Sequence, residues 1–177
     1  MTERVCIDIS LGLLWRSWYR FRQGKKRSRD LERFEFGLEG ELRSLARELA
    51  SGRYIPSPYR TFIVADNKRR EISVAAVRDR VVHRLLYDYL VPLYDPTFVF
   101  DVWSCRAGKG LVGAIERTQE LLRRHRSGYV WRSDITKFFD HVDRAVLLGL
   151  ITRRVTDEKC FQLLRTVISG YPYLFRR

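Results

Sequence analysis

The sequence contains little that would stabilise a small secreted protein or span a membrane. Its three cysteines, Cys6, Cys105 and Cys160, are odd in number and far apart, so neither a disulfide framework nor a zinc site with short ligand spacing is indicated. No apolar run approaches the roughly 18 residues of a membrane span, and Glu3 stands where a secretory signal has only basic residues. We therefore expect a soluble, cytoplasmic protein with no membrane partner.

Acidic residues are scarce relative to basic ones. The chain has 34 Lys and Arg against 21 Asp and Glu, a net charge of +13 at pH 7. This excess predicts attraction to a polyanion and binding that weakens as salt rises, and nucleic acid is the natural partner. With 45% apolar residues in 177, the chain can bury a core and has the size of one domain, or of one domain and part of another.

The basic residues are dense near the N-terminus, where residues 15–33 hold eight basic and two acidic side chains. Aromatic residues are interleaved with them: Trp15, Trp18, Tyr19 and Phe21. This mixture suits phosphate contacts combined with base stacking. It suits equally a solvated basic helix and loop whose aromatic rings pack inward, and the residues alone do not separate the two.

Hydrophobic spacing predicts helices and one hairpin. Apolar residues recur every three or four positions from Leu31 to Leu49, which predicts one amphipathic helix. Residues 61–65 and 71–74 read as the strands of a hairpin, with a basic turn at 66–69. Further helices are expected at residues 76–91 (ended by Pro92), 111–125, 144–154 and 157–169, the last with Asp157 near its N-cap. Helices packed on a small antiparallel sheet predict the α+β class.

The glycine-containing loop at residues 104–110 is not a nucleotide-binding P-loop. Trp103 stands where the first glycine of that motif is required, and Gly110, not Ser or Thr, follows Lys109. The loop can still approach a nucleic-acid backbone closely, because glycine permits it.

Residues 132–143, RSDITKFFDHVD, carry the strongest candidate for chemistry. The run Tyr129–Trp131 reads as a strand that delivers Asp134 towards Phe138 and Phe139. A carboxylate at the end of a strand can hold a divalent metal ion where a triphosphate and a nucleophilic hydroxyl meet. Alternatively, Asp134 caps a turn or the following helix, and the two phenylalanines are core residues.

Several segments, taken in order, resemble the N-terminal half of bacterial reverse transcriptases of the group II intron, retron and diversity-generating retroelement kind. They are GKKRSRDLERFEFGLEGEL at 24–42, NKRREIS at 67–73, AVRDRVVHRLLYDYLVPLYDPTF at 76–98, SCRAGKGLVGAI at 104–115 and RSDITKFFDHVDR at 132–144. The resemblance implies the fingers and partial palm of a right-hand polymerase. Residues 1–30 would be a basic aromatic N-terminal segment, 31–127 the fingers-like region and 128–177 the start of the palm.

The resemblance also implies an RNA-directed DNA polymerase that uses Mg²⁺, an RNA template, a DNA primer and deoxynucleoside triphosphates. Asp134 would be the first catalytic aspartate and a metal ligand, together with the backbone carbonyl of Ile135. Phe139 would screen the sugar 2′ position of the incoming nucleotide and so favour deoxynucleotides. Lys68 and Arg70 would clasp the triphosphate, a role that suits cations on a hairpin.

Two further residues, Arg106 and Lys109, resemble positions in the loop that lies near the template and the nucleotide. Whether an accessory protein binds the basic N-terminal segment stays open.

The chain departs from the family pattern in one respect. Family members continue into a Tyr-x-Asp-Asp motif whose aspartates complete the metal site, and these 177 residues contain no Asp-Asp pair. Two-metal chemistry needs carboxylates around ions about 3.5–4 Å apart. We therefore expect a truncated or partial protein that does not polymerise alone. The alternatives are a non-catalytic RNA-binding module and a metal nuclease using Asp134, Asp140 and Asp143.

Overall fold

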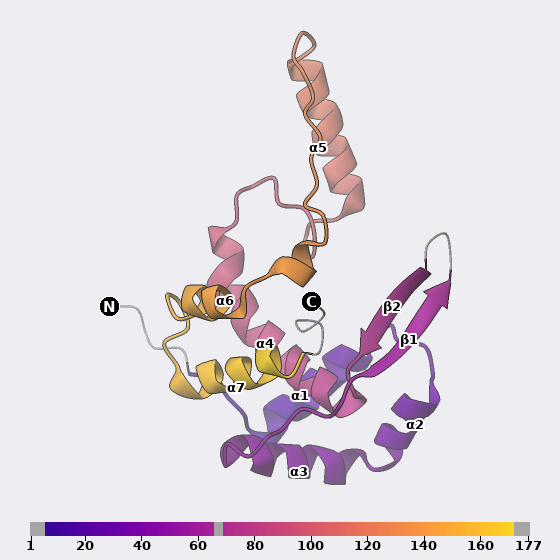
Figure 1. The fold of residues 1–177 in the computed structure, drawn as a ribbon, viewed down its shortest axis with the longest axis vertical. Coiled ribbons are helices and arrows are strands. Elements are labelled where there is room, and N and C mark those ends of the chain that lie inside the picture. The colour runs from indigo at the N-terminus through magenta and orange to yellow at the C-terminus, as the bar shows by residue number, and fades with distance from the viewer. Residues whose placement is uncertain (1–5, 66–68, 172–177) are drawn as a thin grey trace. The chain divides into compact units, whose positions relative to one another are not determined.

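The structure, a computed structural model, describes residues 6–65 and 69–171 and divides into two units (Figure 1). Unit 1 consists of residues 1–90 and 139–177, and unit 2 of residues 91–138. The described residues form seven α-helices and one antiparallel two-stranded sheet, which confirms the predicted α+β class. None of the described helices combines the length and the apolar character that a bilayer crossing requires.

Helix α1 (Leu11–Arg22) begins at Ser10, whose side chain accepts a hydrogen bond from the first turn. One face of α1 is buried in the core of unit 1. The Trp18 ring on that face lies 5.1 Å from the Phe34 ring and 5.8 Å from the Phe21 ring, measured between centroids. These three aromatic side chains join α1 to the next helix along the chain.

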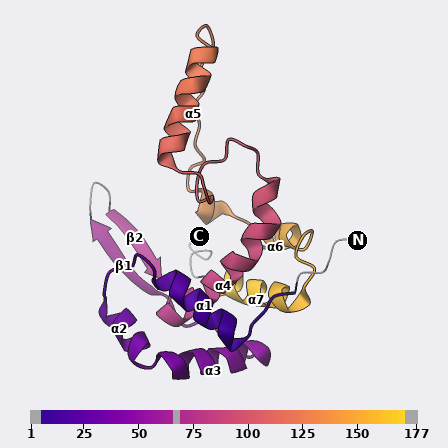
Figure 2. The same ribbon diagram turned by 180° about the vertical axis from the view of Figure 1, so that it is seen from behind.

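The single helix predicted from Leu31 to Leu49 is wrong, because two helices occupy that stretch. Helix α2 (Arg29–Phe36) and helix α3 (Leu38–Ala50) are separated by Gly37, whose φ of −103° and ψ of 16° are not helical. Glycine is less favourable than alanine inside a helix by about 1 kcal/mol, so a break there is inexpensive. The three- and four-residue spacing of apolar residues continues across the break, and both helices bury their apolar faces. Figure 2 shows α1 lying along α3, against which it packs.

The predicted hairpin is confirmed. Strand β1 (Arg60–Ala65) pairs antiparallel with β2 (Arg69–Val74), so Arg69 belongs to the strand and not to the turn. An isolated two-stranded hairpin is marginally stable in water. Arg60, at the root of β1, forms an ion pair of 3.2 Å with Asp30 of α2, which ties the hairpin to the helices.

Helix α4 (Val77–Tyr94) runs past the proline that was expected to end it. Pro92 lies inside the helix, in its last turn. The prediction failed because Pro92 removes only the hydrogen bond that its N–H would have donated to the carbonyl of Asp88, and only two more helical residues follow it. The side chains of α4 that enter the core of unit 1 are Val77, Val81, Val82, Leu85 and Leu86.

A buried carboxylate fastens the segment before the hairpin to α4. Asp79 is 1% exposed and accepts hydrogen bonds from the Tyr54 hydroxyl, at 2.8 Å, and from the Ser57 backbone N–H, at 2.9 Å. Burial, reinforced by the bond to Asp79, raises the pKa of the Tyr54 hydroxyl. The Asp79 clasp, as we call these two bonds, therefore fixes the backbone that leads into β1.

Two helices near the C-terminal end complete unit 1. Helix α6 (Arg144–Ile151) packs on helix α7 (Glu158–Ser169). Asp157 is the N-cap of α7 as predicted, and its carboxylate accepts hydrogen bonds from the N–H groups of Lys159 and Cys160. Both helices agree with the sequence-based prediction, although α6 is three residues shorter than expected.

Unit 2 has no apolar core. It contains a short 3₁₀ turn (Asp95–Thr97), a loop, helix α5 (Leu111–Arg124) and an irregular segment, and none of its residues, all of which are described, is buried. The strand predicted at Tyr129–Trp131 is wrong: the segment is irregular, and Trp131 is 88% exposed. A strand needs a partner for its backbone groups, and the described residues pair no other segment with this one.

Candidate functional site

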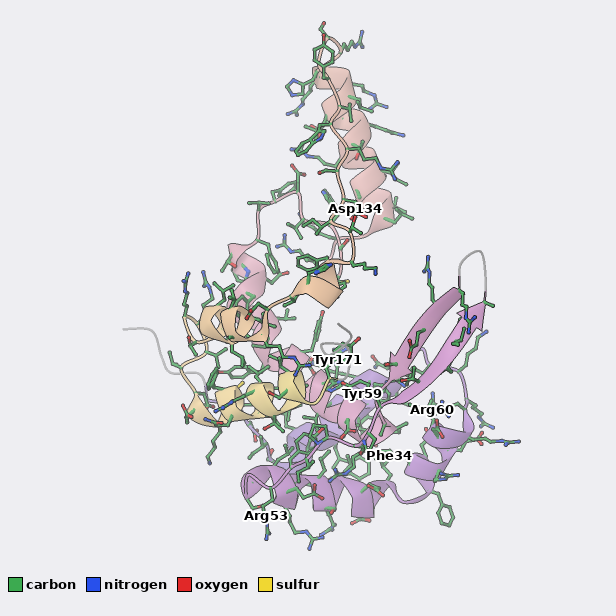
Figure 3. The ribbon with its side chains drawn as sticks, viewed as in Figure 1. Phe34, Arg53, Tyr59, Arg60, Asp134 and Tyr171 are labelled. Atoms are coloured by element: carbon green, nitrogen blue, oxygen red, sulfur yellow. The ribbon has the colours of Figure 1, made fainter. Side chains whose placement is uncertain are left out.

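Asp134, the predicted catalytic carboxylate, lies in the irregular segment of unit 2 after α5 (Figure 3). Its side chain is exposed, and among the described residues it forms no hydrogen bond or ion pair. Asp134 therefore caps neither a turn nor a helix, which removes one of the alternatives left open by the sequence. Its oxygens are accessible to a cation from solution.

The residues that follow Asp134 are also exposed. Ile135 is 66% exposed, and Phe138 and Phe139 are 50% and 81% exposed, so the phenylalanines are not core residues. Lys137, between Ile135 and Phe138, has a φ of 50°. This left-handed conformation costs a non-glycine residue roughly 1–2 kcal/mol and marks a tight turn. Asp134 belongs to unit 2 and Phe139 to unit 1.

The oxygen atoms of Asp134 and Ile135 are suited to provide part of the ligands of a magnesium ion. Mg²⁺ prefers oxygen ligands and is commonly held by one or two carboxylates with substrate phosphates and water. The Asp134 carboxylate and the Ile135 carbonyl are ligands of that kind. No group of three His, Cys, Asp or Glu side chains in the described ranges could hold a metal ion.

One of the two predicted triphosphate contacts, Arg70, lies in the described part of the hairpin. Arg70 lies in β2 opposite Val64, close to the turn, and is exposed. Lys68, its predicted partner, falls outside the described residues. The clasping role of both cations therefore stays a prediction.

In unit 2 the predicted loop residue Arg106 is held by the loop itself. Its guanidinium donates to both carboxylate oxygens of Asp95, at 2.8 and 3.2 Å, and to the backbone carbonyls of Val99 and Val102. The bond from Arg106 holds the pKa of Asp95 below its ordinary value. Only 14% of the Arg106 side chain is exposed, so its observed role is to shape the loop.

Lys109 is placed over two aromatic rings of the same loop. Its ammonium lies 3.9 Å from the Phe100 ring centroid and 4.4 Å from that of Trp103, and it donates to the Phe100 carbonyl. Arg117 of α5 lies 5.5 Å from the same Phe100 ring and pairs with Asp101. The structure thus brings Arg106 and Lys109 together in one ordered loop, and nucleic-acid contact by either stays a prediction.

The N-terminal aromatic residues divide between the two roles that the sequence left open. Trp18 and Phe21 are buried in the core of unit 1. Trp15 and Tyr19 instead stack on each other outside it, with ring centroids 5.9 Å apart, and Tyr19 is 61% exposed. Only the second pair is available for contact with a partner.

Of the two further aspartates in the nuclease alternative, Asp143 has a structural role. Its carboxylate accepts a hydrogen bond of 2.9 Å from the Val146 N–H and is the N-cap of α6. A capping carboxylate is poorly placed to serve as a metal ligand at the same time.

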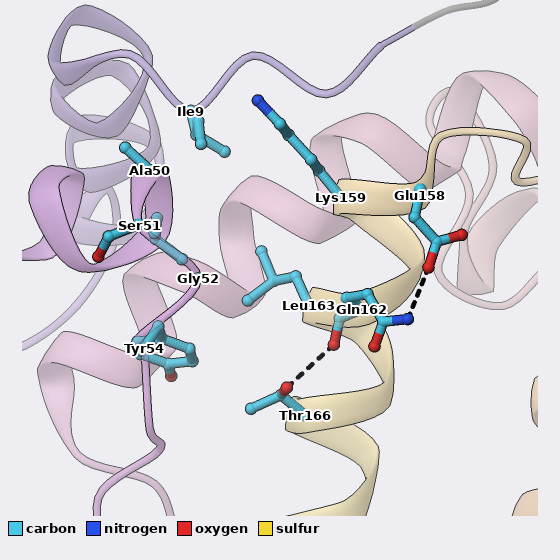
Figure 4. A pocket seen from close by; sticks show the side chains of 11 residues that line it. Ile9, Ala50, Ser51, Gly52, Tyr54, Glu158, Lys159, Gln162, Leu163 and Thr166 are labelled. Atoms are coloured by element: carbon cyan, nitrogen blue, oxygen red, sulfur yellow. Dashed lines mark hydrogen bonds between the residues drawn. The ribbon is translucent and has the colours of Figure 1, made fainter.

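Unit 1 also contains a groove between the end of α3, the N-terminal segment and α7, with a volume of about 330 Å³ (Figure 4). Ile9, Leu49 and Leu163 supply apolar surface. On α7, Gln162 donates to the Glu158 carboxylate at 2.6 Å. Both apolar and polar side chains line the groove, and its described residues form no cluster of like charge that would favour a particular ligand.

Sequence reasoning missed a second cavity, which four arginines line: Arg33, Arg60, Arg78 and Arg80. They come from α2, β1 and α4, and no spacing in the sequence connects them. A signal was nevertheless present, because two arginines stand within the first four residues of α4, where the helix dipole disfavours cations.

Comparison with known proteins finds relatives but no matching family model. Protein YkfC of Escherichia coli is 29% identical over 140 residues, which cover 76% of this chain and 37% of that protein. The group II intron-encoded protein LtrA of Lactococcus lactis is 25% identical over 139 residues, or 75% of this chain and 22% of LtrA.

A plant protein shows the same similarity over a shorter stretch. The mitochondrial nuclear intron maturase 1 of Arabidopsis thaliana is 31% identical over 94 residues, which cover 52% of this chain and 13% of the maturase. The chain thus spans less than two fifths of the length of each of these relatives.

Proposed function

Because the homologues of this chain include a group II intron-encoded protein and an intron maturase, we propose that it forms the fingers and the first palm segment of an RNA-directed DNA polymerase. The resemblance to group II intron proteins predicted from the sequence is confirmed by these relatives. What carries the proposal is similarity over three quarters of the chain to LtrA, combined with five family-like segments in the family's order.

In the proposed reaction, the hydroxyl of a template-bound primer loses its proton to solvent and attacks the α-phosphate of a deoxynucleoside triphosphate. A phosphodiester bond forms as the bond to the β-phosphate breaks, and pyrophosphate leaves. The Asp134 carboxylate and the Ile135 carbonyl would hold Mg²⁺ beside the phosphates. When bound, Mg²⁺ supplies a Lewis acid that stabilises the charge developing on the transferred group. Lys68 and Arg70 hold the triphosphate by charge-assisted hydrogen bonds. The Phe139 ring excludes a ribose hydroxyl by its volume.

The accessibility of the Asp134 carboxylate supports this role, since a buried or capped carboxylate could not reach a metal ion and a nucleotide together. Asp134 is nevertheless a single carboxylate, and the two-metal mechanism requires more than one. We therefore propose that these 177 residues do not extend a primer alone and act within a longer polypeptide or with a partner that supplies the remaining carboxylates.

Primer extension tests the proposal in two steps. The purified 177-residue chain, given Mg²⁺, an RNA template, a DNA primer and deoxynucleotides, should extend no faster than its Asp134→Asn variant. A longer protein that includes these residues should extend the primer, and Asp134→Asn there should reduce kcat by about a thousandfold or more. Undiminished activity of that variant would refute the assignment of Asp134.

A second candidate function, RNA binding without catalysis, is favoured by one observation: the described residues form no group of three or more His, Cys, Asp or Glu side chains that could hold a metal ion. The two functions differ in their dependence on the Asp134 side chain. RNA binding alone should be unchanged by Asp134→Asn in every length of the protein, and no length should extend a primer.

A further inference from the structure

The second cavity of unit 1 lies at the root of the hairpin and has a volume of about 470 Å³, within the range of about 300–1,000 Å³ common for ligand sites. Its polar wall consists of Ser28, Asp30, Arg33, Glu41, Ser57, Arg60, Arg78 and Arg80. Phe34 and Pro58 contribute apolar surface. Figure 3 labels Phe34, which belongs to α2, and Arg60, which belongs to β1.

The positive charge of this cavity is only partly neutralised. Arg60 pairs with Asp30 at 3.2 Å, and Arg78 pairs with Glu48 and approaches Glu41 to 3.9 Å. The remaining two arginines, Arg33 and Arg80, have no carboxylate partner among the described residues. Two guanidinium groups are therefore available to an anion that enters the cavity.

The position of Arg80 strengthens this inference. It is the fourth residue of α4, where the positive end of the helix dipole disfavours a cation. Its guanidinium is nevertheless held in place, 4.8 Å from the centroid of the buried Phe21 ring. A stacked guanidinium keeps its N–H donors free at the edge, where they can form the two parallel bonds that a phosphate accepts.

We propose that this cavity binds a phosphate group through Arg33 and Arg80, with the apolar wall beside them accepting part of the attached nucleoside. The inference rests on the proposed function for the source of the phosphate, which is a nucleic-acid strand or a nucleotide. The site is separate from the predicted triphosphate contact at Arg70, because Arg70 does not line the cavity.

A matched pair of charge reversals on one helix tests the proposal. Arg33 and Arg29 are both exposed residues of α2, but only Arg33 lines the cavity. Arg33→Glu and Arg29→Glu change the net charge equally, so any difference between them reports the site and not the general field. Binding of each 177-residue variant to a fluorescent single-stranded RNA is measured by anisotropy over a range of salt concentrations.

Arg33→Glu should weaken RNA binding about fivefold or more beyond the effect of Arg29→Glu. It should also reduce the salt slope by about 0.7 for each phosphate of a single strand that the variant no longer neutralises. Arg80→Lys keeps the charge and loses the planar fork, so it should weaken binding while circular dichroism and the unfolding midpoint stay unchanged. Equal effects of Arg33→Glu and Arg29→Glu would overturn the proposal.

Titration with inorganic triphosphate, followed by calorimetry, distinguishes the two sources of phosphate. Less heat with Arg33→Glu than with Arg29→Glu, together with unimpaired RNA binding by Arg33→Glu, would assign the cavity to a free nucleotide, since the predicted contacts at Lys68 and Arg70 are the same in both variants. Sensitivity of RNA binding to Arg33→Glu assigns it to the strand. If the wild-type protein binds no RNA, the proposed function fails. If the wild-type protein binds RNA, and Arg33→Glu changes neither RNA binding nor triphosphate binding, only this inference fails.

Discussion

Removal of the Asp79 clasp should destabilise unit 1 more than most single substitutions. In Asp79→Ala, the Tyr54 hydroxyl and the Ser57 N–H both lose their acceptor, and Tyr54 is only 5% exposed. An unsatisfied buried donor costs about 1–3 kcal/mol, so the two together should cost about 2–6 kcal/mol. This is a large part of the roughly 5–15 kcal/mol that keeps a domain folded.

Tyr54→Phe removes one of these bonds and should cost about 1.5 kcal/mol, the lower end of the range for a bond to a charged group. Since both substitutions delete the same bond, the double variant should be less destabilised than the sum of the single variants by about that amount. Urea unfolding followed by far-UV circular dichroism measures all three free energies. A loss below about 0.5 kcal/mol in Asp79→Ala, the level of an ordinary surface substitution, would refute the reasoning.

Three further predictions concern single side chains. Burial lowers the pKa of the His83 imidazole below its ordinary 6.5, so on acidification the unfolded chain binds a proton at His83 before the folded chain does. The urea midpoint should therefore fall as the pH drops below about 6.5, and it should fall less in His83→Gln. Burial raises the pKa of the Cys160 thiol to about 12, so a thiol reagent should modify only the two exposed cysteines until urea unfolds the protein; three reactive thiols in the folded chain would contradict this. In Gly113→Ala the new methyl group would lie 2.7 Å from the Trp103 ring and displace it, so the near-UV circular dichroism of the loop should change, whereas an identical spectrum would show that the ring is not held there.

Local patterns in the sequence predicted most of the helices and the hairpin. The hairpin, α5 and α7 form where hydrophobic spacing and capping residues place them, since each is specified by its own residues. The break at Gly37 was not predicted because the apolar spacing continues through it. The end of α4 was misplaced because the effect of Pro92 depends on its distance from the end of the helix.

The candidate site was less predictable than the fold. The strand expected before Asp134 depends on a partner strand, which no local pattern specifies. The self-contained network around Arg106 depends on Asp95, eleven residues away, and on carbonyl groups that have no signature in the sequence. The arginine-lined cavity could not be located from the sequence, since its walls meet only after α2, β1 and α4 have packed, and the two arginines at the start of α4 were its one local signal.

The absence of buried side chains in unit 2 has a calorimetric consequence. Heat capacity and denaturant sensitivity both increase with the apolar area that unfolding exposes. Residues 91–138 bury almost no apolar surface in the folded chain. They are held instead by ion pairs such as those that Arg106 and Arg117 form with Asp95 and Asp101. Their melting should therefore add little curvature to a thermogram of the whole chain and should respond to ionic strength more than to urea.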